Sequence, residues 1–498
     1  MKKILEKAKD DFLKTIKDKN LYIFFFISLL FFGIFCAEQK ALDTYDVFSY
    51  DPSRITGHFA SCGRFVTAGA NALLQGLLRL GDTTVYYLSY GFALICTVLS
   101  MYVFNNVIKK DVKNDFVSML ISTLVIINPF SLELFIYIEK GIMMLSVLLC
   151  VMAFKQIADF FEKKDKKSIL FAGLLMFIAN CCYQGTVGIF VVLSLVYILK
   201  YTKNIKDFIL NNIIVAFTYG IPTVLNFVLI KIFYSNGRVD GSIVLSESIK
   251  KVFGGIVEIF EGSYGLLPKY TFSIGIVILV ATAIYKIIKD KLTLKQSALV
   301  IGSLLYIILV ATLVTVAPQL CQATESIWFV PRSSYPVAAL IGILMLYLFT
   351  NFEIKDKLKK IVAAVGIVLL SMQLFLFIRH SINIFIVNYE DKQIITQILD
   401  FIDEYEEKTG IDVNKVAIYS DKNKSWTYQG IITVKDMNTK AFASDWALLS
   451  LLRYYSGEDY IEIEKDPLIE QNFSRRNWDY YSDQQLVIKD DVVHICNY

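Results

Sequence analysis

The chain has 498 residues, of which 55% are hydrophobic, 14% aromatic and 19% charged, with a mean hydropathy of +0.52. An average soluble domain carries about a quarter charged residues, so this composition excludes a disordered, collagen-like, coiled-coil or disulfide-knotted secreted chain. The formal net charge of +4 is too small to indicate a nucleic-acid partner, which leaves an integral membrane protein with many spans.

Apolar runs recur along the first three quarters of the chain. A crossing of about 30 Å of hydrocarbon needs about 20 mostly apolar residues. The first run follows the charged segment 1–20, unlike the short charged start of a signal peptide, so we expect it to remain as a span. About eleven spans are predicted, some of them short, at residues 21–37, 84–106, 115–130, 141–161, 168–183, 185–201, 208–234, 270–287, 296–317, 336–352 and 360–379.

Lysines gather in every second connection between these runs, while the intervening connections hold few. Because cytoplasmic loops carry the excess of Lys and Arg, this alternation predicts a cytoplasmic N-terminus. With an odd number of spans, the segment after the last one lies outside the cytoplasm. The lysines that mark the cytoplasmic connections are Lys109, Lys110, Lys113, Lys163, Lys164, Lys166, Lys167, Lys200, Lys203, Lys206, Lys286, Lys289, Lys291, Lys295, Lys355, Lys357, Lys359 and Lys360.

After the last span the composition changes, at Ser381, to a charged and mixed pattern with no further apolar run. We therefore divide the chain into a membrane-embedded domain, residues 1–380, and a small extracytoplasmic α/β domain, residues 381–498. Apolar residues at helical spacing predict a helix over 391–408. The other expected elements are a helix over 443–455 and strands over 415–419, 430–434 and 486–488.

Two outer connections are too long to be simple loops. In each of them apolar residues recur at helical spacing, over residues 66–77 after the first span and over residues 249–260 after the seventh. A helix with one apolar and one polar face suits the plane of the membrane surface. We expect two interfacial helices beside an outer chamber, where a lipid-linked substrate would present its head group.

Candidate chemistry concentrates in the first outer connection. Transfer of a sugar from a phosphate-linked donor to a hydroxyl needs a carboxylate that takes the acceptor proton and cations that hold the leaving phosphate. Asp51 and Arg54 could supply both from one turn, whereas a solvated loop with locally paired charges is the alternative. Within residues 42–64 of this connection the acidic and basic side chains are Asp43, Asp46, Asp51, Arg54, His58 and Arg64.

Other outer-facing positions add Glu133 and Glu139 after the third span, Tyr183 and Gln184 between the fifth and sixth, and Arg332 before the tenth. Each also fits a plainer role, as an interfacial acid, a polar turn or an interfacial arginine. The sequence has no zinc-protease, serine-hydrolase or nucleotide-binding motif. No side chains recur at the spacing of a known metal-binding motif, so the sequence requires no cofactor. The clustered carboxylates could nevertheless hold a divalent cation, which stays an open alternative.

In their order along the chain, several short motifs resemble the Gtr type-II glucosyltransferases, polytopic GT-C enzymes that decorate bacterial surface polysaccharides. The resemblance covers most of the chain. One departure is that the family usually has adjacent aspartates before the first arginine, whereas Tyr50 precedes Asp51 here. The motifs are Gly63-Arg64 at the end of an acidic outer loop, Asn128-Pro129-Phe130 leading to Glu133, Cys182-Tyr183-Gln184-Gly185, and Phe442-Ala-Ser-Asp-Trp446 followed by Gly457.

The resemblance implies a GT-C-like enzyme of the bacterial cytoplasmic membrane. Such an enzyme takes glucose from an undecaprenyl-phosphate carrier and passes it to a hydroxyl of a cell-surface glycan, with inversion at the anomeric carbon. The implied base is a loop aspartate, with Asp51 ranked ahead of Asp46 and Asp43. The implied ligands of the donor phosphate are Arg54, Arg64 and Arg332, and those of the sugar or acceptor are His58, Glu133, Tyr183 and Gln184.

Two other classes of function also fit a polytopic chain. A transporter or flippase for a polysaccharide or lipid-linked sugar usually carries ionisable groups at mid-span depth, whereas the span centres here hold neutral groups such as Asn226 and Gln373. No internal repeat of the kind found in many transporters is visible. A non-catalytic scaffold of surface-glycan assembly is compatible with the same sequence.

Overall fold

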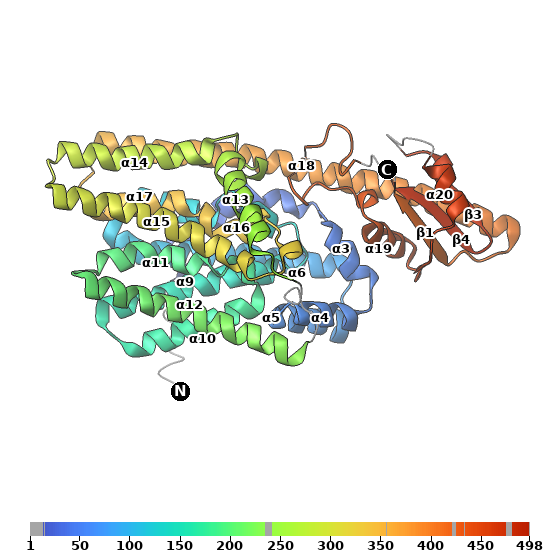
Figure 1. Cartoon of the computed structure of the whole chain (residues 1–498), viewed down its shortest axis with the longest axis horizontal. Helices are drawn as coiled ribbons and strands as arrows, with labels where there is room; N and C mark the ends of the chain where they lie inside the picture. Colours follow the sequence, from blue (N-terminus) through green and yellow to red (C-terminus); the bar gives the residue numbers. More distant parts are fainter. Residues whose placement is uncertain are drawn as a thin grey trace.

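The computed structural model consists of a bundle of long helices with a small sheet-containing unit at one end (Figure 1). It describes residues 13, 15–234, 242–354, 356–420, 425–432, 434–474 and 481–497. Buried apolar side chains form two clusters, one inside the bundle and one inside the sheet unit. The prediction of a mostly helical chain with a small C-terminal strand region is confirmed.

Eight helical segments of the described chain are long and apolar enough to cross a membrane. Large apolar side chains such as Phe217 and Leu305 are exposed on them, as expected of a surface that faces lipid. The segments are α2 with the turn η1 (Lys19–Phe32 and Gly33–Cys36), α6 (Asp82–Val112), α9 (Lys140–Lys163), α12 (Ile205–Phe233), α14 (Thr271–Lys289), α15 (Leu294–Leu320), α16 with α17 (Pro331–Ala338 and Leu340–Asn351) and α18 (Asp356–Thr409).

Three of the predicted spans form shorter helices, so the count of eleven crossing helices is not confirmed. α7 (Asp115–Ile126) has 12 residues, α10 (Lys166–Cys182) has 17, and α11 (Ile189–Lys200), which follows the turn η3 (Gln184–Thr186), has 12. At 1.5 Å per residue, α7 and α11 are each about 18 Å long, little more than half of the hydrocarbon thickness. α7 ends before Asn128-Pro129 because proline disfavours helical backbone at the residue that precedes it.

The chain between α7 and α9 is almost entirely buried, yet most of it is irregular: it contains a single short helix, α8 (Ser131–Leu134). We call residues 127–139 the buried segment. Backbone of this kind is tolerated inside a membrane only where protein surrounds it. The side-chain amide of Asn128 supports it by donating to the carbonyl of Tyr335 (3.3 Å), and its Oδ1 accepts from the N–H of Phe130 (3.0 Å). The buried segment carries three polar side chains of the candidate site.

Short helices gather at the end of the bundle that faces the sheet unit (Figure 1). Both outer segments predicted to be helical are helical: residues 66–77 lie in α5 and η2, and residues 249–260 lie in α13. α13 runs across the direction of the long helices (Figure 1). The short elements are α3 (Leu42–Ser49), α4 (Pro52–Ser61), α5 (Phe65–Asn71), the π-helical turn η2 (Ala72–Leu77), α13 (Leu245–Gly262), η4 (Ser263–Gly265) and η5 (Thr324–Ser326).

The sheet unit has four strands in the order β2-β1-β4-β3. β1 pairs in parallel with β2 and β4, and β3 and β4 form an antiparallel hairpin. The predicted strands at 415–419 and 486–488 are confirmed, but the one at 430–434 is wrong at its described residues, because Gly430 adopts a left-handed φ of 81° in a turn. The elements are β1 (Lys415–Ser420), η6 (Ala441–Ala443), α19 (Asp445–Ser456), β2 (Ile461–Glu462), α20 (Pro467–Phe473), η7 (Asp483–Gln485), β3 (Leu486–Lys489) and β4 (Val492–Asn497).

α18 connects the bundle to the sheet unit (Figure 1). Its 54 residues extend for about 80 Å, far more than a membrane crossing requires. The apolar face predicted for residues 391–408 packs in the sheet core through Ile394, Ile395 and Ile398. The predicted domain boundary at residue 381 lies inside this continuous helix, so the two units share one rigid element.

A second connection joins the sheet unit to α3. Tyr45 of α3 is buried in the sheet core, and its ring lies 5.3 Å from that of Tyr454 in α19. The ammonium of Lys40 donates to the Tyr454 hydroxyl (2.7 Å), which in turn donates to the Asp82 carboxylate. Ser450 of α19 donates to Asp46 of α3 (3.1 Å). The sheet unit therefore fixes the helix that carries two of the candidate aspartates.

We expect Tyr454→Phe to loosen residues 38–41, which lead into α3. The substitution removes the hydrogen bonds to Lys40 and Asp82, each of which contributes about 1.5–3 kcal/mol, and it leaves the aromatic packing on Tyr45 in place. Hydrogen exchange of the full chain in detergent should show faster exchange of the amides of residues 38–41. Tyr389→Phe, at an exposed position of α18, serves as the control, and equal exchange in both variants would contradict the proposed connection.

Candidate active site

The centre of the candidate site is a buried ion pair between Glu133 and Arg332. Glu133 is fully buried in α8, and Arg332 lies in the first turn of α16. The backbone N–H of Arg332 donates to Oε2 of Glu133 (2.6 Å), and its guanidinium donates to Oε1. The carboxylate thus binds both the positive end of a helix and a fixed cation, the two environments that stabilise it best.

Tyr137 completes this first group. The guanidinium of Arg332 lies over its ring at 4.5 Å and also donates to its hydroxyl. Burial raises the pKa of Tyr137 well above its usual value, and Arg332, Glu133, Asp43 and Asp436 all act on it electrostatically. Tyr137 and these four charged side chains therefore lie in the same region of the structure.

A second arginine has the same arrangement nearby. Arg64, at the start of α5, pairs with Glu139 at the end of the buried segment (3.4 Å) and lies over the ring of Tyr183 at 4.8 Å. Tyr183 is buried, and the charges of both Arg332 and Arg64 act on it. Tyr183 therefore lies between the two arginine groups, and together they form a two-arginine site built on one buried segment.

Both arginines keep part of their surface accessible. The exposed fraction of the side chain is 16% for Arg332 and 19% for Arg64, whereas Nε of Arg64 is buried without a hydrogen-bond partner. Their glutamate partners are less exposed, at 0% and 9%. In each pair the buried glutamate fixes the arginine, and the exposed part of the guanidinium can bind an anion such as a phosphate.

The three loop aspartates have different surroundings. Asp43 is exposed on α3 and acts on the two-arginine site, since its charge adds to the burial that raises the pKa of Glu139. Asp46 faces α19, and burial raises its pKa. Asp51 is exposed, and its carboxylate caps α4 by accepting from the N–H of Ser53 (2.6 Å). Asp43 is thus the aspartate that the fold brings to the arginines.

Arg54 and His58 lie on α4, outside the two-arginine group. The guanidinium of Arg54 lies over the ring of Tyr50 at 3.8 Å, and the charges of both Arg54 and His58 lower the pKa of Asp46. Both side chains are exposed. α4 therefore forms a charged rim next to α3.

Gln184 and Gly63 hold the backbone of Arg64 in place. The Gln184 amide donates to the Cys62 carbonyl (3.0 Å) and to Asn226 of α12 (3.2 Å), and Asn226 donates to the Gly63 carbonyl (2.9 Å). Gly63 has a left-handed φ of 75°, and a Cβ there would lie 2.9 Å from the Gln184 amide nitrogen. Glycine is therefore required sterically before Arg64, and Gln184 contacts the backbone that positions Arg64.

The sheet unit also reaches the site. Asp436 lies 3.8 Å from the Arg332 guanidinium and accepts a hydrogen bond from the indole of Trp328 (3.3 Å). Its neighbour Lys435 pairs with Glu258 of α13 (2.7 Å). Trp328 is 56% exposed, so an open aromatic face lies next to a carboxylate at the edge of the two-arginine site.

Sequence reasoning missed Tyr137, Trp328 and Asp436. Tyr137 follows Glu133 by four residues, but α8 ends at Leu134, so helical spacing gives no signal for this contact. Nothing in the sequence placed Asp436 at the site. In the part of the chain that the structure describes, no group of three or more His, Cys, Asp or Glu side chains could hold a metal ion.

Comparison with protein families identifies the chain's relatives. A family model described as glucosyl transferase GtrII matches residues 40–335, a range that holds the buried segment, both arginines and all three loop aspartates. No curated protein matches the chain.

We expect Glu133→Gln to destabilise the protein strongly. Removing one partner of a buried ion pair costs about 3–5 kcal/mol, because the other charge stays buried. Glu162→Gln, which breaks the exposed pair with Lys110, should cost about 0–1 kcal/mol. Thermal unfolding of both variants in detergent checks this, and a similar loss in the two would contradict the buried pair.

Asp46 and Asp51 should affect stability with opposite signs. Burial raises the pKa of Asp46, so its ionisation disfavours the folded state, whereas hydrogen bonds from Ser53 lower the pKa of Asp51, so its ionisation favours the folded state. At pH 7, Asp46→Asn should therefore raise the unfolding temperature and Asp51→Asn should lower it. The Asp46 effect should vanish below about pH 4, and the Asp51 effect should fade as the pH falls further. A change of the same sign in both variants at pH 7 would contradict these environments.

Proposed function

The chain belongs to the GtrII glucosyl transferase family, and on this premise we propose that it transfers a hexose, most simply glucose, from an undecaprenyl-phosphate-linked donor to a hydroxyl of a cell-surface polysaccharide. The family match and the apolar helices identify a membrane glycosyltransferase. The observation that carries the finer proposal is the two-arginine site with Asp43 next to it.

Arg332 and Arg64 are the proposed ligands of the donor phosphate. Two guanidinium groups can neutralise the charge that develops on a leaving phosphate, and they do so best when they are fixed before the reaction. That fixation comes from the buried segment, through Glu133 and Glu139. The planar guanidinium groups of Arg332 and Arg64 also stack on the rings of Tyr137 and Tyr183.

Asp43 is the proposed base, ahead of Asp46 and Asp51. It would take the proton of the acceptor hydroxyl while that oxygen attacks the anomeric carbon. The bond between the anomeric carbon and the phosphate oxygen breaks in the same step, and the lipid phosphate leaves toward the arginines. This single displacement inverts the anomeric carbon. The support for Asp43 is that it is exposed and that its charge acts on Arg332, Glu139 and Tyr137.

The acceptor side is proposed to lie toward Trp328, Asp436 and His58. An exposed indole offers a face on which a sugar ring can lie, and a carboxylate accepts from sugar hydroxyls. The sheet unit would thus help to present the acceptor glycan. In this proposal the N-terminus is cytoplasmic, and the site and the sheet unit face the outside of the bacterial cytoplasmic membrane.

We expect Asp43→Asn to abolish sugar transfer, with a loss of about a hundredfold or more, while Asp51→Asn retains most of the activity. The assay uses the full chain in membranes supplied with polyprenyl-phosphate glucose and an acceptor polysaccharide. Because both positions are exposed, both variants should fold. Full activity of Asp43→Asn, or loss of activity in Asp51→Asn alone, would overturn the assignment of the base.

Surface polysaccharide from a strain that lacks the gene separates the enzyme from a transporter. Loss of one side-chain hexose, with the polymer otherwise exported, is the expected result. Loss of all exported polymer would contradict the proposed transferase and favour transport instead.

A further inference from the structure

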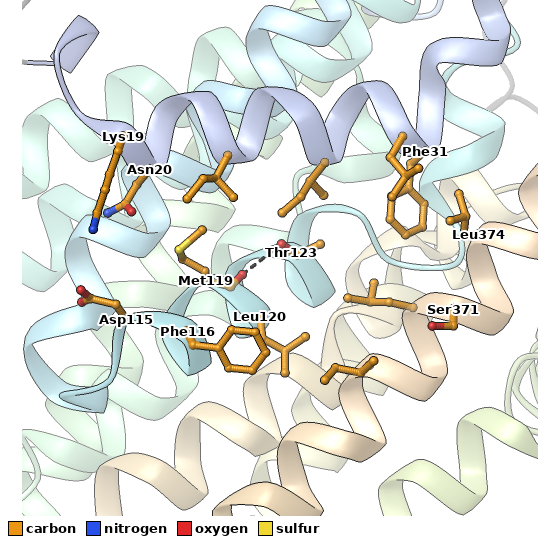
Figure 2. Close-up of a pocket in the computed structure, with 15 residues that line it drawn as sticks. Lys19, Asn20, Phe31, Asp115, Phe116, Met119, Leu120, Thr123, Ser371 and Leu374 are labelled. Atoms are coloured by element: carbon orange, nitrogen blue, oxygen red, sulfur yellow. Dashed lines mark hydrogen bonds between the residues drawn. The ribbon is translucent and has the colours of Figure 1, made fainter.

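The bundle contains a groove that is formed by elements other than those of the candidate site. α2, α7 and α18 line a cavity of about 500 Å³ (Figure 2). Ligand pockets in proteins have volumes of about 300–1,000 Å³. Apolar lining side chains such as Leu30 and Phe116 are 60% and 59% exposed, so the groove belongs to the surface that the bundle presents to lipid.

The charged lining residues lie together at one end of the groove. Figure 2 shows Lys19 and Asp115 at that end, and Phe31 and Leu374 at the other. Both charged side chains are exposed, and neither makes an ion pair with any residue that the structure describes. The groove thus combines an apolar length with one positive and one negative group at its mouth.

The length of the groove matches one leaflet of a bilayer. From Lys19 to Phe31 the helix α2 rises by about 18 Å, whereas half of the hydrocarbon thickness is about 15 Å. α7, which forms the opposite wall, is also too short to cross the membrane. Extended acyl chains from a single leaflet would therefore fill the groove without crossing the midplane.

The mouth of the groove is at the end of α2 away from α3. Lys19 begins α2, while Asp43 follows its other end. A head group at Lys19 is therefore separated from the two-arginine site by the length of a span. The ligand of this groove is for that reason distinct from the sugar donor.

We propose that the groove binds one zwitterionic phospholipid with a primary-amine head group. Its phosphate would accept from the Lys19 ammonium, its own ammonium would donate to the Asp115 carboxylate, and its acyl chains would lie between α2, α7 and α18. The opposite charges at the mouth favour this head group over a purely anionic one, which Asp115 would repel.

The test measures lipid bound to the full chain in detergent. After delipidation, the protein is titrated with phosphatidylethanolamine and, separately, with phosphatidylglycerol, and bound lipid is counted by native mass spectrometry. We expect about one phosphatidylethanolamine per chain, and a loss of affinity of about tenfold or more in Lys19→Glu. Lys17→Glu, an exposed lysine outside the groove lining, is the matched control and should bind as the wild type does.

A second pair of variants tests the apolar length of the groove. Ile367→Trp places a large side chain in the lining of the groove, whereas Val368→Trp changes its exposed neighbour outside the lining. Ile367→Trp should abolish retention of the lipid, and Val368→Trp should leave it unchanged. Equal binding in Lys19→Glu and Lys17→Glu, equal binding in the two tryptophan variants, or a preference for phosphatidylglycerol would each overturn the proposal.

Discussion

The buried pair between Glu133 and Arg332 is the interaction on which the arrangement of the site depends. A fully buried carboxylate is costly unless it is paired and hydrogen-bonded, and here it binds the guanidinium of Arg332 and the backbone N–H of the same residue in the first turn of α16. The pair joins residues 199 positions apart. It therefore fixes the buried segment against α16, and through Glu139 the same segment positions Arg64. One buried stretch of chain thus orients both cations.

The sheet unit is part of the same arrangement. It is connected rigidly through α18, it holds α3 through Tyr454 and Ser450, and it brings Asp436 to within 3.8 Å of Arg332. A domain that both fixes the helix with the candidate base and reaches the arginines can couple acceptor binding to the geometry of the site. This explains why a membrane transferase would carry a folded unit at one end of its bundle.

Much of this architecture could be predicted from the sequence, because local patterns determine it. Apolar runs placed the long helices, and helical spacing predicted α13 and the second half of α18. Pairings over long distances could not be predicted: nothing local joins Glu133 to Arg332 or Asp436 to Trp328. The capping role of Asp51 did have a local signal, since Asp51-Pro52-Ser53 is the pattern of a helix N-cap with proline in the first turn. A capping carboxylate turns toward its own helix, which is one reason why we propose Asp43 as the base ahead of Asp51.

Binding of undecaprenyl phosphate to the purified full chain tests the central claim most directly, because it requires neither the sugar nor the acceptor. Titration calorimetry in detergent would compare the wild type with Arg332→Gln, Arg64→Gln and, as a control, the exposed Arg79→Gln. The two-arginine site predicts a loss of affinity of about tenfold or more in each of the first two variants and no change in the third. Equal affinity in all four proteins would contradict it.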